Sequence, residues 1–131
     1  MINELARQIH ANARSKGFYE GQVNIAERLC LIHSEVSEAL EADRKNHYTS
    51  LKEHWHLKAM ADPNYGATFA VDENFKAEFE HAVKSTFEDE LADIMIRVMD
   101  LAAYKGIDLD NHIKVKMRYN AMRGYKHGKK Y

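Results

Sequence analysis

Proline occurs only once in the 131-residue chain, at Pro63, and cysteine only once, at Cys30. A single cysteine excludes an internal disulfide framework and fits a reducing compartment. No uncharged run approaches the roughly 20 apolar residues that a membrane-spanning helix needs, and no basic-then-apolar leader opens the sequence. We therefore expect a cytoplasmic protein without a membrane span. With almost no proline to interrupt helices, the length and composition favour a single all-α domain over residues 1–131.

Acidic and basic residues are distributed unevenly, although the formal net charge is only −1. From Asn111 onward the chain has seven basic residues and no acid, whereas the first 110 residues hold twelve bases and all twenty acids. A basic end on an acidic body indicates a polyanionic partner. Charge alone leaves open whether that partner is a nucleotide, a nucleic acid or a membrane surface.

The spacing of apolar residues predicts a helical bundle in which two long helices run antiparallel. Asn24 and Glu27 have the spacing of a capping box at the start of the first long helix. The second has no breaker over its length of about 45 Å, at 1.5 Å per residue. The predicted helices cover residues 2–16, 24–45, a short piece within 51–60, 73–105, and a last one from Asp108 or Asp110 to Arg123, with a turn over 62–66.

Each long helix carries a pair of acids three residues apart: Glu35 with Glu38, and Glu90 with Asp93. At about 100° per residue, both carboxylates of a pair project from the same side of the helix, at the edge of its apolar stripe. If the stripes pack together, four carboxylates converge along one seam. Oxygen ligands of this kind suit Mg²⁺. The alternative is solvated surface charge, with Asp93 paired to Arg97.

A basic block follows near the end of the chain. Lys116, Asn120 and Arg123 recur at positions i, i+4 and i+7, which places them on one helix face. Arginine can bind phosphate through two parallel hydrogen bonds, lysine supplies a point charge, and asparagine supplies neutral hydrogen bonds. The alternative is a solvated, frayed terminus.

These blocks, in this order, resemble the MazG-like, all-α nucleoside triphosphate pyrophosphohydrolases. The similarity runs over residues 24–41, 87–96 and 116–129, about a third of the chain. It implies cleavage of a ribo- or deoxyribonucleoside triphosphate to a monophosphate and pyrophosphate. It also implies Mg²⁺, or Mn²⁺ in its place, and a homodimer or homotetramer.

The resemblance also implies roles for individual residues. Glu35, Glu38, Glu90 and Asp93 would bind the metal, and Glu35 or Glu38 could be the base that activates water. The phosphate and sugar contacts would come from Lys116, Asn120, Arg123, Tyr125, Lys126 and Lys129. By position in the chain, the base pocket is expected near Phe18, Asn24 and Trp55.

Two features depart from the family pattern. Ser34 stands where the family commonly has an additional acid, which leaves open a nucleotide-binding regulator with little catalytic activity. The segment 46–73 between the acidic blocks is long, and its role is open. A second alternative is a helical module that binds nucleic acid through its basic end, although a nucleotide partner is favoured. The histidines, including His54 and His56, have no Cys/His spacing that predicts a closed zinc site.

Overall fold

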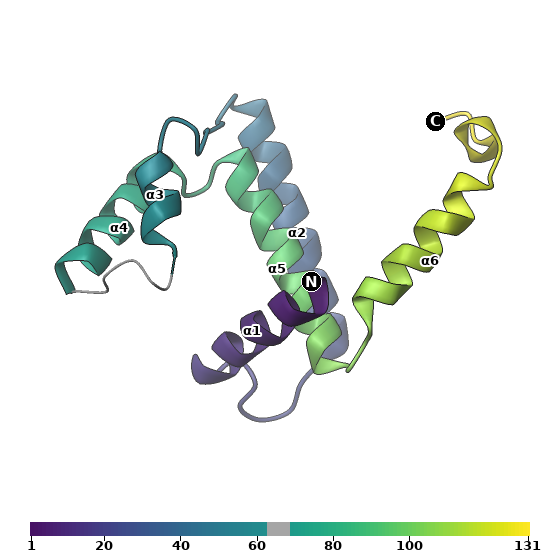
Figure 1. Cartoon of the computed structure of the whole chain (residues 1–131), viewed down its shortest axis with the longest axis horizontal. Coiled ribbons are helices and arrows are strands. Elements are labelled where there is room, and N and C mark those ends of the chain that lie inside the picture. Colours follow the sequence, from purple (N-terminus) through teal and green to yellow (C-terminus); the bar gives the residue numbers. More distant parts are fainter. Residues whose placement is uncertain (63–68) are drawn as a thin grey trace. The chain divides into compact units, whose positions relative to one another are not determined.

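The computed structural model describes residues 1–62 and 69–131, and all regular structure in this part of the chain is helical. The described helices are α1 (Ile2–Ser15), α2 (Ile25–Arg44), α3 (Trp55–Met60), α4 (Phe69–Ala82), α5 (Phe87–Tyr104), α6 (Leu109–Ala121) and the 3₁₀ turn η1 (Tyr125–Gly128) (Figure 1). The all-α prediction is therefore confirmed. Two compact units can be distinguished: unit 1 comprises residues 1–28 and 96–131, and unit 2 comprises residues 29–95.

In unit 1 the first turns of α1 and α6 cap each other. Of the two predicted caps, Asp108 and Asp110, it is Asp108 that caps α6, by accepting a hydrogen bond of 3.2 Å from the amide of Asn111. The carboxylate of Asp110 accepts bonds from the amides of Ile2 and Asn3 at 3.1 and 3.0 Å. The side chain of Asn3 in return accepts a bond from the amide of Asp110 at 3.2 Å. These bonds satisfy amides that a helix start otherwise leaves unpaired.

A second contact in unit 1 joins α1, the loop after it and the second half of α5. The carboxylate of Asp100 lies 2.8 Å from Nδ1 of His10 and accepts a 2.6 Å hydrogen bond from the hydroxyl of Tyr19. Burial and the neighbouring carboxylate raise the pKa of Tyr19, so its hydroxyl stays a donor. The ring of Tyr19 stacks on the ring of Tyr104, with 5.2 Å between the centroids. The guanidinium of Arg28 also lies over the Tyr19 ring, 4.6 Å from its centroid.

In unit 2 the end of α2 lies beside the start of α5. The carbonyl of His47, just after α2, accepts a 2.9 Å hydrogen bond from the amide of Phe87, and Glu88 accepts one of 2.9 Å from the amide of Thr49. The two helices therefore run antiparallel here, as expected. The start of α2 also matches the prediction, since Asn24 accepts a 3.1 Å bond from the amide of Glu27.

The prediction of one uninterrupted helix over residues 73–105 is wrong. α4 ends at Ala82 and α5 begins at Phe87, with Ser85 between them at a positive φ of 62°. The buried hydroxyl of Thr86 donates to the carbonyl of Val83 and accepts from the amide of Asp89, whose carboxylate accepts from Ser85. Thr86 thus caps α5, and Asp89 binds back to the residue before the cap, so a new helix starts without a proline or glycine.

The remaining part of unit 2 is the pair α3 and α4, which pack against each other (Figure 1). The short helix expected within residues 51–60 is found as α3. The turn predicted over residues 62–66 lies outside the described residues beyond Asp62.

Burial in unit 2 differs from the apolar-stripe prediction. Leu29, Val36 and Leu40, expected in the core, are each 49% exposed, whereas the acids Glu35 and Glu90 are 6% and 5% exposed. Of the α2 stripe, only small side chains such as Ala39 are fully buried. A single chain thus leaves apolar surface open along α2. Among the described residues, none of the helices is both long and apolar enough to cross a membrane.

Candidate metal centre

The acidic pairs of α2 and α5 meet in unit 2. One carboxylate oxygen each from Glu35, Glu90 and Asp93 lies within 4.8 Å of the others. Glu38, one helical turn after Glu35, is the neighbour that hydrogen-bonds to Glu90. The antiparallel packing of α2 on α5 therefore gathers the four acids that the sequence analysis singled out.

Glu90 is the central member of this acidic cluster, which we define as Glu35, Glu38, Glu90 and Asp93. Its Oε2 atom is buried and has no hydrogen-bond partner among the described residues. A carboxylate oxygen removed from water without a partner is costly, on the order of several kcal/mol if it carries charge. A cation at this position would remove that cost.

The protonation of Glu90 reflects the same surroundings. Burial, followed by the charge and hydrogen bond of Glu38 and the charges of Glu35 and Asp89, raises the pKa of Glu90 to about 7. Removal from water and nearby negative charge both disfavour the ionised carboxylate. Asp89 is a contributor that the spacing of the two pairs did not reveal, although it directly precedes Glu90.

The residues fit a hard divalent cation. Mg²⁺ prefers oxygen ligands at about 2.0–2.1 Å, so two ligands on opposite sides of one ion are about 4.2 Å apart. Oxygen atoms that already lie within 4.8 Å of one another need only small side-chain rotations to reach that spacing. Glu35, Glu90 and Asp93 would form the core of such a site, with Glu38 at its edge.

Open space borders the acidic cluster on two sides. A pocket of about 440 Å³ is lined by Glu38 and Glu90, by other residues of α2 and by Lys45, the first residue after that helix. Another, of about 350 Å³, is lined by Asp93 and Asp89 of α5 and by α4 residues such as Lys76. A ligand from solution can thus reach the acidic cluster through either pocket.

We expect the metal-free protein to lose stability as the pH rises from about 5 to 7. The folded state holds a proton on Glu90 that the unfolded chain, with an ordinary pKa of 4.5, has already released. The proton therefore stabilises the folded state at low pH and dissociates as the pH rises through about 7, the pKa of Glu90 in the folded state. Its loss lowers the free energy of unfolding by on the order of 2 kcal/mol. Thermal unfolding followed by circular dichroism with a chelator measures this loss.

Glu90→Gln is the matched control for the pH experiment, because glutamine keeps the shape and cannot ionise. This variant should show a flatter dependence of melting temperature on pH and should exceed the wild type in stability above pH 7 without metal. An identical pH dependence in both proteins would contradict the assignment of the proton to Glu90.

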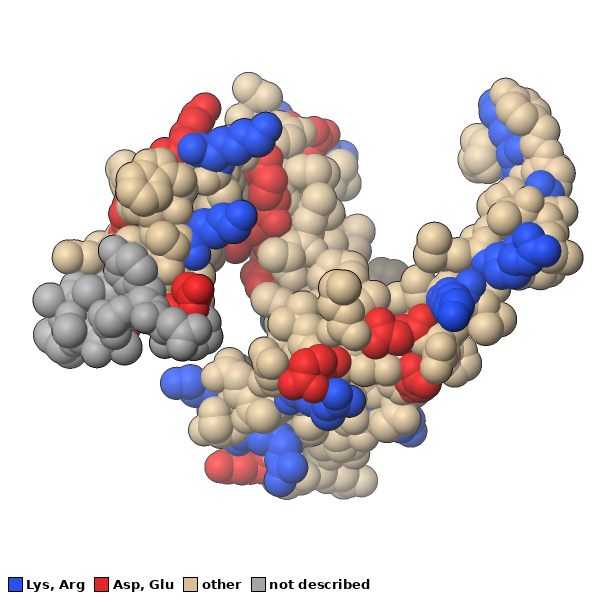
Figure 2. All heavy atoms as spheres, in the orientation of Figure 1, with Lys and Arg blue, Asp and Glu red and all other residues tan. Residues whose placement is uncertain are grey.

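The basic block lies in unit 1 and forms its own surface (Figure 2). The guanidinium of Arg123 lies 5.7 Å from the ring centroid of Tyr119 and donates a 3.5 Å bond to the carbonyl of His127. Nζ of Lys116 lies 5.0 Å from the centroid of the same ring. Asn120 has a buried Oδ1 atom without a partner among the described residues. Two of the predicted phosphate residues therefore share Tyr119 as a support.

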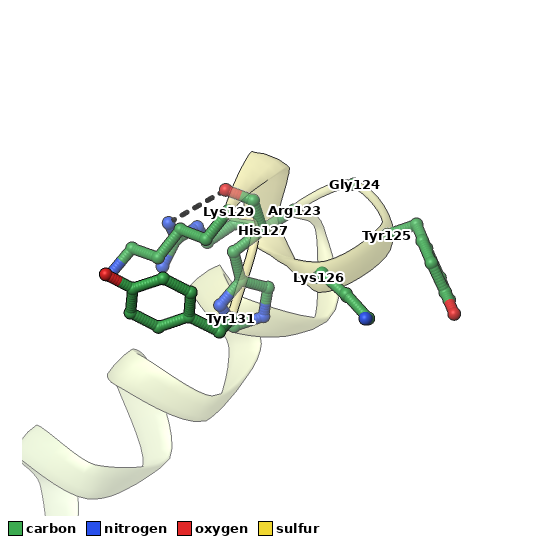
Figure 3. Close-up of a pocket in the computed structure, with 7 residues that line it drawn as sticks. All are labelled: Arg123, Gly124, Tyr125, Lys126, His127, Lys129 and Tyr131. Carbon is green, nitrogen blue, oxygen red and sulfur yellow. Dashed lines mark hydrogen bonds between the residues drawn. The ribbon is translucent and has the colours of Figure 1, made fainter.

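Helix α6 ends at Ala121, slightly before the predicted end at Arg123. The tail after it folds around a pocket of about 530 Å³ (Figure 3). The pocket is lined by Arg123, Gly124, Tyr125, Lys126, His127, Lys129 and Tyr131. Three predicted cations of the tail thus face one hollow. Tyr125 is 90% exposed and projects away from Arg123 in Figure 3, so its ring does not close this pocket.

The residues predicted for a base pocket have different surroundings. Phe18 is 63% exposed in unit 1, where its carbonyl accepts a hydrogen bond from Arg28. The side-chain oxygen of Asn24 is used as the cap of α2. Trp55, in unit 2, is 70% exposed and contacts His56 edge-on. The rings of Phe18 and Trp55 are thus exposed, each in its own unit, and the cap uses only the side-chain oxygen of Asn24.

Comparison with known families, curated proteins and solved structures finds no match to this chain.

Proposed function

We propose that this protein is an Mg²⁺-dependent nucleoside triphosphate pyrophosphohydrolase, which releases a nucleoside monophosphate and pyrophosphate. The observation that carries the proposal is the meeting of Glu35, Glu90 and Asp93 around a buried, unpartnered oxygen of Glu90. The order of the three sequence blocks, which resembles the MazG-like family, supplies the reaction class.

The acids have different proposed roles because their burial differs. Glu35 and Glu90 are buried and would hold the metal with Asp93, whereas Glu38 is exposed and lines a pocket. Glu38 is therefore better placed than Glu35 to accept a proton from an attacking water. When bound, Mg²⁺ supplies positive charge that offsets the phosphates and favours ionisation of water. Mn²⁺ has the same ligand preference and is expected to substitute.

The basic block is proposed to bind phosphate oxygens. Arg123 offers a planar fork of donors, Lys116 a point charge, and Asn120 its free amide, while Lys126 and Lys129 add charge around the tail pocket. Positive charge gathered in this way would concentrate a nucleoside triphosphate from solution. Phe18 in unit 1 and Trp55 in unit 2 are each proposed separately as a surface on which a nucleobase can stack.

The test is to incubate the protein with each ribo- and deoxyribonucleoside triphosphate, with and without Mg²⁺, and to quantify monophosphate and pyrophosphate together. Equal amounts of the two products, formed only with metal, are expected. Release of inorganic phosphate and a diphosphate instead would contradict the proposed bond cleavage. Metal-dependent binding without products would favour the regulator with Ser34 in place of an acid.

We expect the protein to form at least a homodimer, and a homotetramer is also compatible with the exposed apolar surface of α2 and α5. Helix length does not support this expectation, because α5 has only 18 residues and is shorter than the predicted helix of about 45 Å. However, Leu29, Val36 and Leu40 of α2 and Leu91 and Met95 of α5 are 44–49% exposed in unit 2. An exposed apolar row of this kind is typically covered by a partner.

Light scattering at micromolar concentration tests the assembly. Val36→Glu combined with Leu40→Glu should weaken self-association at least tenfold, because a charge would enter the apolar contact. Val115→Glu is the control, since Val115 is 70% exposed on α6 in unit 1. An active protein that remains strictly monomeric would refute the expectation.

A further inference from the structure

Two histidines that are close in the sequence and a glutamate 22 positions after the second of them meet between α3 and α4 of unit 2. His54 precedes α3, His56 lies in its first turn, and Glu78 lies on α4. One possible ligand atom of each lies within 4.8 Å of the others, and Nε2 of His56 directly contacts Oε1 of Glu78. We propose that His54, His56 and Glu78 form a binding site for a transition metal of the zinc class, which links α3 to α4.

The backbone explains how two histidines in a His-x-His sequence share one site. In a regular helix, residues two apart point about 200° away from each other. His54 is not helical, with φ −116° and ψ 43°, and it is the residue before the first turn of α3. This conformation brings its ring to within 6.3 Å of the ring of His56, measured between centroids. Glu78 then completes the cluster from the adjacent helix.

The donor set differs in kind from the acidic cluster. Two imidazole nitrogens and one carboxylate oxygen are the ligands of zinc sites with three protein ligands, and imidazole favours Zn²⁺, Co²⁺ or Ni²⁺ over Mg²⁺. Ligand atoms at about 2.0–2.1 Å around a tetrahedral ion are about 3.4 Å apart. Atoms that start within 4.8 Å of each other can reach this spacing by small rotations.

The surroundings leave the site open to an ion. The side chains of His56 and Glu78 are 35% and 34% exposed, so a metal can enter and water can fill a fourth position. A metal held by both residues would close a loop of the chain, because His56 and Glu78 are 22 positions apart. Such a link restricts the unfolded chain and ties the two helices together.

The sole tryptophan of the chain reports directly on this site. Trp55 stands between the two histidines in sequence, and its ring centroid lies 5.8 Å from that of His56. Titration of the full chain with Co²⁺ should therefore quench tryptophan fluorescence with one equivalent of metal. Zn²⁺ should displace Co²⁺ and restore the signal, whereas millimolar Mg²⁺ should not.

The variants assign the ligands. His56→Ala and Glu78→Gln should each weaken Co²⁺ and Zn²⁺ binding at least tenfold, a loss of the size reported even for residues that only orient metal ligands. His33→Ala, at an exposed histidine of α2, and Asp93→Asn, in the acidic cluster, should leave the binding of Co²⁺ and Zn²⁺ beside Trp55 unchanged. If circular dichroism shows that His56→Ala is not folded, Glu78→Gln carries the test, because glutamine preserves the size of the side chain.

Several results would overturn the site. These are the absence of quenching, equal affinity in the wild type and Glu78→Gln, or displacement of Co²⁺ by Mg²⁺ as readily as by Zn²⁺. The last result would place the metal at oxygen ligands alone. Since none of these measurements uses hydrolysis, the outcome is independent of the proposed pyrophosphohydrolase activity.

Discussion

Asp93→Asn is expected to reduce kcat/KM for the preferred nucleoside triphosphate at least a thousandfold, which corresponds to about 4 kcal/mol of transition-state stabilisation. Asp93 shares the acidic cluster with Glu35 and Glu90, and an amide in its place lowers the negative charge that attracts Mg²⁺. Glu38→Gln should have an effect of similar size if Glu38 accepts the proton from water. Steady-state kinetics at saturating Mg²⁺ measure both losses.

The fold should survive these changes. Without metal, either substitution removes one of several repelling carboxylates, so the melting temperature in a chelator should stay constant or rise. In wild type, added Mg²⁺ should raise the melting temperature, and this increase should shrink in Asp93→Asn. The combination of a stable fold with lost catalysis would separate a metal ligand from a residue needed for folding.

Glu27→Gln is the matched control for the acidic cluster. Glu27 lies in the first turn of α2, is exposed, and belongs to the same helix as Glu35 and Glu38. Its kinetics should stay within about twofold of wild type, with at most a few tenths of a kcal/mol of helix stability lost. Full activity in Asp93→Asn would remove this residue from the metal site.

Arg123→Ala is expected to lower kcat/KM roughly ten- to a thousandfold, about 1.4 to 4 kcal/mol. The guanidinium is held beside Tyr119 and the carbonyl of His127, which leaves its remaining donors available to phosphate oxygens. Arg123→Lys should recover little, because an ammonium group cannot form two parallel bonds in one plane. Deletion of residues 126–131 should raise KM more than it lowers kcat, if the tail only gathers the anion.

Arg118→Ala is the control for charge alone, since Arg118 is exposed on the last turn of α6 and outside the tail pocket. The nucleic-acid alternative predicts a different pattern from the phosphate-binding proposal. It requires salt-sensitive DNA or RNA binding that is lost on deletion of residues 126–131, with hydrolysis unchanged. Unaltered nucleotide kinetics in both Arg123→Ala and the truncated chain would defeat the phosphate role.

Local signals in the sequence were sufficient for much of the helical pattern. Asn24 begins α2 as predicted, and Asp108, one of the two predicted caps, begins α6, because an N-cap depends only on a side chain and the amides of the next turn. The break before α5 also had a local signal, the N-cap side chain of Thr86 followed three residues later by Asp89. Proline and glycine alone do not predict this break. Buried Thr86 and the hydrogen bond from the amide of Phe87 to the carbonyl of His47 start the new helix.

The acidic pairs were identifiable from their spacing, but their environment was not. The helical wheel placed Glu35 and Glu90 at the edge of an apolar stripe, whereas packing buries both acids and leaves Val36 and Leu40 half exposed. The raised pKa of Glu90 follows from that burial and from carboxylates on a second helix. The charges on α5 alone therefore do not determine the pKa of Glu90.

The sequence by itself determined the helical class, the helix start at Asn24, the start of α6 to within Asp108 or Asp110, and the pairing of acids on single helix faces. These depend on interactions within a few residues, which periodicity and side-chain chemistry describe. Only the tertiary structure decided that Glu90 would hold an unpartnered buried oxygen and that Glu78 would join His54 and His56. Both depend on which helices pack together, and that is set by contacts between residues far apart in the chain.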